Sequence, residues 1–196
     1  EDTAGAEGDD SFTATTGPLT ADKTIVGTDD ISGGDGDDTI AISLGANFAG
    51  FTTTGTDTGS MTGVETVELS AADAIARSFD ATGVSGVTTY KVDGTNAVVN
   101  IADAADLAAL DLSNIASGTF SITFTAPTGG TSPVAGTDDT LDLTVEGLGS
   151  ATADIAVTAA GVETLAVTSN AAATAAGATN YLDTTSVGAA TVTVEG

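Results

Sequence analysis

Short apolar and polar residues alternate along much of the chain, and this pattern predicts strands. Residues 40–44 read Ile-Ala-Ile-Ser-Leu, which places Ile40, Ile42 and Leu44 on one face of an extended segment. The same period of two recurs, and each run reads as a half-buried strand of about 4–6 residues. The other runs are Val67/Leu69, Val99/Ile101, Phe120/Ile122/Phe124, Leu141/Leu143/Val145, Ile155/Val157, Leu165/Val167 and Val192/Val194.

Helix is indicated only by two short Ala-rich stretches, 71–77 and 103–110. A loop, or a single turn between two strands, is an equally good interpretation of both, because neither stretch is long enough for a stable isolated helix. The hydrophobic pattern as a whole therefore predicts an all-β protein.

An internal duplication organises these strands. Residues 63–67 read Gly-Val-Glu-Thr-Val and recur at 161–165 as Gly-Val-Glu-Thr-Leu. Two further segments recur at similar offsets, 38–42 at 139–143 and 79–94 at 182–196. One ordered set of strands thus occurs twice, at 38–95 and 139–196, and 96–138 forms extra rungs or a connector. Such repetition of short strands is typical of stacked solenoid rungs.

Residues 33–41 read Gly-Gly-Asp-Gly-Asp-Asp-Thr-Ile-Ala. They match in full the nonapeptide G-G-x-G-x-D-x-U-x, the calcium-binding repeat of RTX proteins. Its glycines permit positive φ angles and leave backbone carbonyl oxygens uncovered, and its aspartate adds a carboxylate where the turn becomes a strand. Calcium prefers about 6–8 oxygen ligands, which such a turn supplies. The candidate ligands are Gly33, Gly34, Asp35, Gly36, Asp37 and Asp38.

One such turn supplies about half of a calcium coordination shell, so a neighbouring rung must supply the rest. We expect segment 27–32 to do so. Ile31 precedes Ile40 by nine residues, and Asp29 and Asp30 lie near the matching aspartate position. The alternative is a Gly/Asp-rich surface turn that binds no metal.

A second, degenerate nonapeptide precedes the first. Residues 5–13 read Gly-Ala-Glu-Gly-Asp-Asp-Ser-Phe-Thr, with Ala6 where the second glycine belongs. Its candidate calcium ligands are Gly5, Glu7, Gly8 and Asp10, and a metal-free turn is again the alternative. The segment Gly-Thr-Asp-Asp at 136–139 lacks the double glycine and is interpreted as a solvated turn.

These motifs favour a right-handed parallel β-roll or β-helix, a solenoid with irregular rungs, because β-roll turns stack directly onto further parallel rungs. β-Sandwich modules with strands every 8–12 residues are the alternative. Three regions are expected. Residues 1–45 form the RTX-like calcium-binding start of the roll, 46–126 a first solenoid module, and 127–196 a second, duplicated module.

The formal net charge is −25, from 28 acidic residues against three basic ones, Lys23, Arg77 and Lys91. The first 38 residues hold 11 acids and one lysine, and repulsion at this density opposes a compact state unless cations offset it. Aspartate outnumbers glutamate 21 to 7, as expected for calcium turns. Halophilic adaptation is an alternative source of the charge, but it does not account for the glycine pattern. Nucleic acid is excluded as a partner, because phosphate contacts need clustered Lys and Arg.

The chain contains neither cysteine nor histidine. It therefore has no disulfide framework, no Ser-His-Asp triad and no His-ligated zinc. Glu65 and Glu163 could be considered as a carboxylate pair for glycoside chemistry, but they occupy equivalent repeat positions, which favours a structural role. No apolar run approaches the ~20 residues that span a bilayer. We expect neither an enzyme nor membrane insertion, and the chain reads as a segment of a larger protein.

The order of these motifs resembles RTX-type surface-layer (S-layer) proteins of Gram-negative bacteria. The resemblance is carried by 5–13, 33–41, 63–70 and 80–89, in that order. It implies type I secretion, an extracellular location at the cell surface, folding on Ca2+ binding and self-association into a lattice. Any contact with a cell-surface polysaccharide would be made by regions outside this chain. A stalk or binding module of a large secreted RTX adhesin is the alternative function.

Long RTX blocks carry many consecutive nonapeptides, whereas this chain has one full copy and one degenerate copy. This departure predicts a few structural calcium ions at one end of an irregular β-helix, in place of a long regular ladder of ions.

Overall fold

The computed structural model describes residues 3–4, 8, 10–16, 24–54, 57–127, 129–170 and 179–196. All regular elements in these residues are β-strands, and none of them is helical. The Ala-rich stretch 71–77 bends between two strands, and 103–110 does the same, so the loop interpretation is correct for both. Stretches this short gain more from the strand pairing on either side than from a marginal helix.

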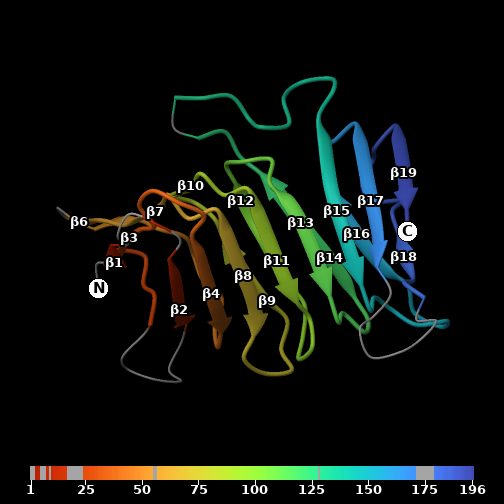
Figure 1. Ribbon diagram of the computed structural model, residues 1–196, viewed down its shortest axis with the longest axis horizontal. Coiled ribbons are helices and arrows are strands. Elements are labelled where there is room, and N and C mark those ends of the chain that lie inside the picture. The colour runs from red at the N-terminus through yellow and green to blue at the C-terminus, as the bar shows by residue number, and fades with distance from the viewer. Residues whose placement is uncertain are drawn as a thin grey trace.

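The largest sheet, here called the long sheet, contains eight strands, and each pair of neighbouring strands in it is parallel (Figure 1). Its strands follow each other in chain order from one edge to the other. They are β2 (Ser11–Thr16), β4 (Thr39–Leu44), β8 (Thr66–Ala71), β11 (Thr89–Asp93), β13 (Ala109–Ser113), β15 (Thr140–Glu146), β17 (Thr164–Asn170) and β19 (Thr191–Glu195).

Two smaller parallel sheets complete the framework. The five-stranded sheet contains β9 (Arg77–Asp80), β12 (Val99–Ala104), β14 (Thr119–Phe124), β16 (Ile155–Ala159) and β18 (Leu182–Asp183). The four-stranded sheet contains β1 (Thr3–Ala4), β3 (Asp30–Ser32), β7 (Ser60–Thr62) and β10 (Val84–Ser85). A small antiparallel pair, β5 (Thr53–Thr54) and β6 (Asp57–Thr58), lies beside them.

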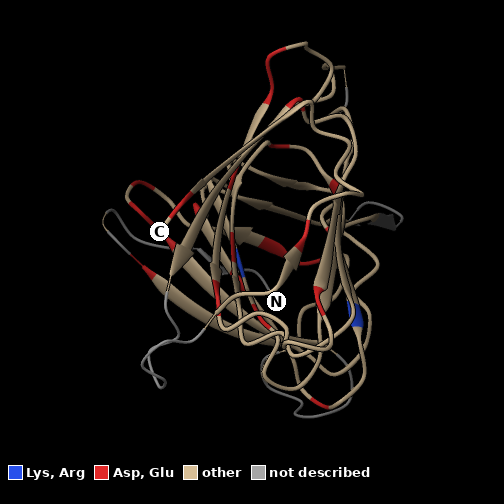
Figure 2. Ribbon diagram, turned by 90° about the vertical axis from the view of Figure 1, so that its right-hand side faces the viewer, with Lys and Arg blue, Asp and Glu red and all other residues tan. Residues whose placement is uncertain are grey.

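The chain leaves the long sheet, visits a smaller sheet and returns, and each return adds one parallel strand. Thr39 pairs with Thr66, Thr66 with Thr89, and Thr89 with Ala109. The sequence separation between paired residues of successive strands therefore falls from 27 to 23 to 20 residues over these three returns. Viewed along the long axis, the sheets form separate walls (Figure 2). Parallel pairing throughout these sheets is compatible with a β-helix, and it differs from the antiparallel sheets of an immunoglobulin-type sandwich.

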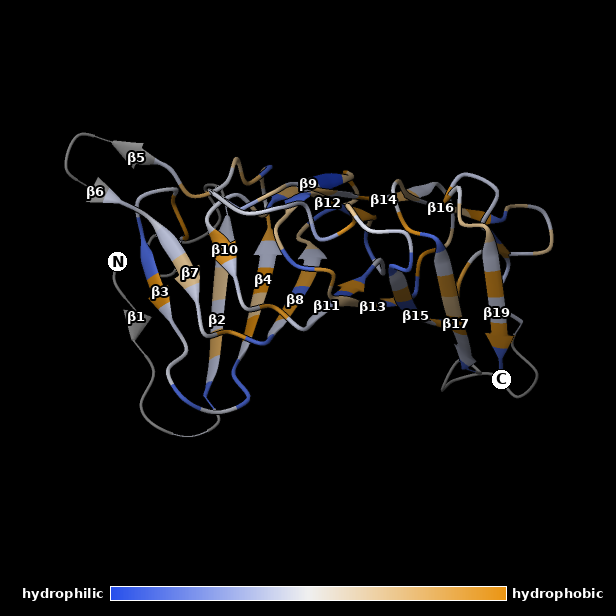
Figure 3. Cartoon of the chain, turned by 90° about the horizontal axis from the view of Figure 1, so that it is seen from above, coloured by the Kyte–Doolittle hydropathy of each residue, from blue (hydrophilic) through white to orange (hydrophobic). Residues whose placement is uncertain are grey.

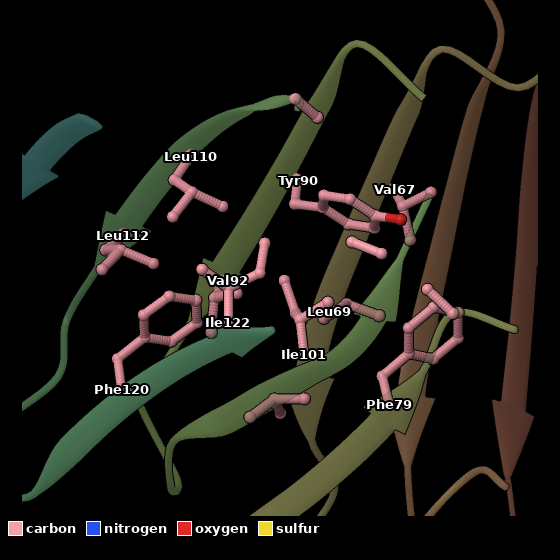
Figure 4. Close-up of a cluster of buried hydrophobic side chains, with 14 of the residues drawn as sticks. Val67, Leu69, Phe79, Tyr90, Val92, Ile101, Leu110, Leu112, Phe120 and Ile122 are labelled. Atoms are coloured by element: carbon pink, nitrogen blue, oxygen red, sulfur yellow. The ribbon is translucent and has the colours of Figure 1, made fainter. Parts of the chain in front are cut away.

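Apolar side chains alternate along most strands of the two larger sheets and fill the space between the sheets. Figure 3 shows the resulting hydrophobic bands along the strands, and Figure 4 shows residues of the long sheet facing residues of the five-stranded sheet. Tyr90 and Leu110 on the first side and Phe79 and Phe120 on the second are each at most 1% exposed. Burial raises the pKa of the Tyr90 hydroxyl. The strands predicted from the alternating pattern are all present.

The duplication is visible in three dimensions. The segments that follow Asp38 and Asp139 become β4 and β15, and those that follow Glu65 and Glu163 become β8 and β17. All four strands belong to the long sheet. The intervening segment 96–138 contributes β12, β13 and β14 to the same two sheets, so it adds strands to the stack and does more than connect the copies.

Candidate metal site

The nonapeptide turn at 33–38 connects β3 to β4 and is stacked between two other turns. On one side, the Gly8 N–H donates to the Asp35 carbonyl oxygen at 2.8 Å. On the other side, the Gly33 N–H donates to the Thr62 carbonyl oxygen at 3.0 Å. Gly34 and Gly36 have φ angles of 101° and 130°, which explains why glycine is needed at both positions. The turn is therefore held by its neighbours in the stack on both sides.

Asp38 is the residue directly before β4, and its side chain is fully buried (0% exposed). Its Oδ1 accepts the Asp10 N–H at 2.6 Å. Its Oδ2 is buried and has no hydrogen-bond partner among the described residues. A buried polar oxygen without a partner is costly, and such an atom in a native structure needs a physical explanation.

Gly33 brings this oxygen close to the backbone. A Cβ atom at Gly33 would overlap the Gly63 carbonyl oxygen and would lie 2.5 Å from Asp38 Oδ2. Both oxygens therefore lie beside the same point, next to a residue that has no side chain to separate them. Carboxylate and carbonyl oxygens are the ligands that Ca2+ prefers, so this donor set fits the ion that the nonapeptide predicts.

The remaining residues of the turn lie further out. Asp35, Gly36 and Asp37 are exposed, and so is Gly34. Asp35 and Asp37 therefore add negative charge at this turn without being buried. Only Asp38 of this turn combines a carboxylate with complete burial.

The structure places segment 27–32 differently from the prediction. Asp29 and Asp30 lie at the end of β3 that is opposite to the turn. The Asp29 carboxylate accepts the Val26 N–H at 2.9 Å, and that of Asp30 accepts the Ser60 hydroxyl at 3.1 Å. The nine-residue spacing between Ile31 and Ile40 does not stack them, because β3 and β4 belong to different sheets.

The neighbour of the full nonapeptide is instead the degenerate one. Phe12 pairs with Ile40 in the long sheet, and the Thr39 N–H donates to the Asp10 carbonyl oxygen at 2.9 Å. The structure thus brings Gly8 and Asp10 next to the turn at 33–38. Gly5 and Glu7 lie outside the described residues.

Glu65 is a site residue that the sequence analysis did not assign to the metal. Its Oε2 accepts the Asp38 N–H at 2.8 Å, and its own N–H donates to the Asp38 carbonyl oxygen at 3.1 Å. Together with Gly63 it comes from the duplicated Gly-Val-Glu-Thr segment. The duplication was the available signal, because it placed Glu65 and Glu163 directly before equivalent strands.

The second copy of the unit has the same contact between its Asp and Glu residues, but the Oδ2 atom of its aspartate has a hydrogen-bond partner. The Asp139 N–H donates to Glu163 Oε2 at 3.0 Å. However, Asp139 Oδ2 accepts the Gly136 N–H at 3.0 Å, and Asp138 is exposed. This turn satisfies its carboxylate internally, in agreement with its interpretation as a solvated turn.

The described residues contain no group of three or more His, Cys, Asp or Glu side chains that could hold a metal ion. The candidate site therefore depends on one buried carboxylate together with backbone carbonyl oxygens. Backbone oxygens are not part of a group of His, Cys, Asp or Glu side chains. Within the same residues, no helix is long and apolar enough to cross a membrane.

A separate groove of about 590 Å3 crosses the outer face of the long sheet. Lys91 Nζ lies 3.0 Å from Glu68 Oε1 in it. Burial raises the pKa of the Asp111 carboxyl; Lys91 opposes this rise, and Glu146 and Glu68 add to it. None of the predicted metal ligands lines this groove, so it is distinct from the candidate metal site.

Comparison with protein-family models, with curated proteins and with solved structures finds no match to this chain.

Proposed function

We propose that this chain is a structural segment of an RTX-type surface-layer protein, which folds on binding calcium outside the cell and self-assembles into a lattice. Its fold is a right-handed parallel β-solenoid. The observation that carries the proposal is Asp38 Oδ2, a fully buried carboxylate oxygen that has no partner among the described residues and lies in the turn of a full calcium-binding nonapeptide.

The residues that would hold the ion are Asp38, through its carboxylate, and the turn 33–36 and Gly63, through backbone carbonyl oxygens. A bound Ca2+ would neutralise the buried carboxylate and would give Oδ2 the partner that it does not have among the described residues. It also offsets part of the repulsion from the acidic N-terminal region. Since the site exists only when Gly8 and Asp10 and the turns at 33–38 and 62–66 are stacked, binding free energy becomes folding free energy.

The fold supports the solenoid and its assembly in two ways. The connection between two parallel strands of one sheet is right-handed in almost all proteins, which supports the right-handed solenoid proposed here. Stacked parallel strands also leave open sheet edges, through which identical chains can associate. At β19, Val192 and Val194 are 43% and 67% exposed, although they continue rows that are buried in β17.

The proposal is tested by thermal unfolding and circular dichroism of the wild type and of Asp38→Asn, with calcium and with a chelator. Calcium at about 100 times its Kd should raise the wild-type Tm by about 5–10 °C. Asp38→Asn should lose this response. Asp139→Asn is the matched control, because its carboxylate lies before an equivalent strand but is already hydrogen-bonded, and it should respond like the wild type.

Identical wild-type spectra and Tm values with calcium and with chelator would contradict calcium-dependent folding. Electron microscopy of the calcium-loaded protein tests the lattice. Ordered sheets support the surface-layer function, whereas dispersed monomers that bind a glycan support the RTX adhesin alternative.

A further inference from the structure

The two copies of the duplicated unit share a three-bond contact between neighbouring turns, here called the acid clamp. In the first copy, the Asp38 N–H donates to Glu65 Oε2 at 2.8 Å, and the N–H groups of Glu65 and Thr66 donate to the Asp38 carbonyl oxygen at 3.1 and 2.9 Å. In the second copy, Asp139 and Glu163 make the first of these bonds at 3.0 Å. The other two bonds of the second copy measure 3.1 and 3.0 Å.

The two clamps differ in what the clamped aspartate does with its side chain. Asp38 is fully buried, its Oδ1 is fixed by the Asp10 N–H at 2.6 Å, and its Oδ2 has no partner among the described residues. Asp139 is half-buried, and its Oδ2 is occupied by the Gly136 N–H at 3.0 Å. Nearly equal backbone geometry therefore surrounds one unsatisfied and one satisfied carboxylate.

We propose that Glu65 is a positioning residue for the cation site at Asp38, and that Glu163 in the same geometry has a structural role only. This inference rests on the proposed function, because it concerns the same calcium site. Glu65 acts through the backbone of Asp38 and holds the carboxylate in the direction that leaves Oδ2 beside Gly33 and the Gly63 carbonyl oxygen.

The physical reason is preorganisation. The acid clamp fixes the backbone of Asp38 on one side, and the Asp10 N–H fixes its Oδ1 on the other. Together these contacts prevent the carboxylate from turning toward water or toward a further backbone donor. Once the turns are stacked, Oδ2 therefore has no partner among the described residues until an ion binds, and the ion meets a ligand that is already in place. Without the clamp, the carboxylate can find another partner, and calcium must then compete with that partner.

The experiment is a calcium titration of the unfolding midpoint, with Glu65→Ala and Glu65→Gln compared with Glu163→Ala and Glu163→Gln. Glu65→Ala should raise the calcium concentration at half-effect about tenfold, as expected when one charge-assisted hydrogen bond is lost. Glutamine keeps a neutral acceptor, so Glu65→Gln should raise it only about threefold. Both Glu163 variants should lower the Tm equally with calcium and with chelator, and should leave the calcium midpoint within about twofold of the wild type.

The outcomes separate this inference from the proposed function. A wild type without any calcium response overturns both. If Asp38→Asn abolishes the response but the Glu65 variants leave the calcium midpoint unchanged, the proposed function stands and the positioning role fails. Equal shifts from Glu65 and Glu163 variants also overturn it, and so does a Glu65→Gln variant that is no better than Glu65→Ala, since the charge would then act directly on the ion. Should Glu65→Ala not fold, the comparison of Glu65→Gln with Glu163→Gln decides by the same criterion.

Discussion

Two turns of this chain require glycine for different physical reasons. Gly33 has no positive φ angle, and it is glycine because a Cβ atom would overlap the Gly63 carbonyl oxygen. Gly118 has a φ angle of 111°, and among the described residues only its own chain neighbours can lie within 4 Å of the position where its Cβ would be. The first is required by space between neighbouring turns and the second by backbone conformation.

These reasons predict different costs for the same substitution. Gly33→Ala should lower the free energy of unfolding by about 3 kcal/mol, because backbone must move to admit the methyl group. Gly118→Ala should lower it by about 1 kcal/mol, through backbone strain alone. Denaturant unfolding of both variants in calcium measures the difference. Equal costs would show that the contact between Gly33 and Gly63 is not tight in solution.

The sequence predicted the site only for those residues that lie close together along the chain. Asp38 was identified because the nonapeptide contains the glycines and the aspartate within one turn. Glu65 was missed because its role depends on which residue lies opposite Asp38 in the next turn, and that register is not encoded nearby. The expectation that Asp29 and Asp30 stack beside the turn was wrong, because it followed from a nine-residue period. Ile40 pairs instead with Phe12, 28 residues earlier.

At the scale of the strand, the alternating pattern identified most strands of the long sheet, but it did not identify the short strands of the four-stranded sheet. The strands β4, β8 and β15 show a clear period of two in their sequences. β3, β7 and β10 have only two or three residues, which is too short for any period to appear. β13 was obscured because it begins at Ala109, inside an Ala-rich stretch. Parallel pairing could be inferred from the repeats, but the partners could not.

The row formed by Leu143, Val167 and Val194 provides a matched test of burial in the long sheet. Val167 is 4% exposed and pairs directly with Val194, which is 67% exposed in the edge strand β19. Val167→Ala should therefore lower the free energy of unfolding by about 2 kcal/mol. Val194→Ala should change it by less than about 0.5 kcal/mol.

Chemical denaturation of the two valine variants at low protein concentration provides the measurement. A large cost for Val194→Ala under these conditions would mean that β19 is covered in solution. The same measurement at increasing protein concentration then tests whether a second copy is what covers it.

For the whole molecule, the dominant fact is the net charge of −25. Acidic residues, red in Figure 2, occur on turns and strands throughout and greatly outnumber the blue basic ones. General screening and specific calcium binding both oppose this repulsion, but they depend differently on concentration. Screening changes gradually as the Debye length falls from about 30 Å at 0.01 M to about 10 Å at 0.1 M ionic strength, whereas binding at a site saturates.

Sodium chloride should therefore raise the Tm of the wild type and of Asp38→Asn gradually and by similar amounts. Millimolar calcium, compared at matched ionic strength, should raise the Tm of the wild type alone and should reach a plateau. Thermal unfolding across both titrations distinguishes the two effects. A calcium effect that sodium chloride reproduces in full at the same ionic strength would assign the stabilisation to screening.

The acid clamp also bears on how this chain avoids misaligned pairing. An alternating Thr/Val pattern forbids a slip of one residue, which would turn every apolar side chain outward, but it tolerates a slip of two. A two-residue slip of β8 along β4 would carry Glu65 away from the Asp38 N–H, and the same holds for β17 along β15 with Glu163 and Asp139. One clamp lies in each copy of the duplicated unit, so each copy carries its own marker of correct alignment.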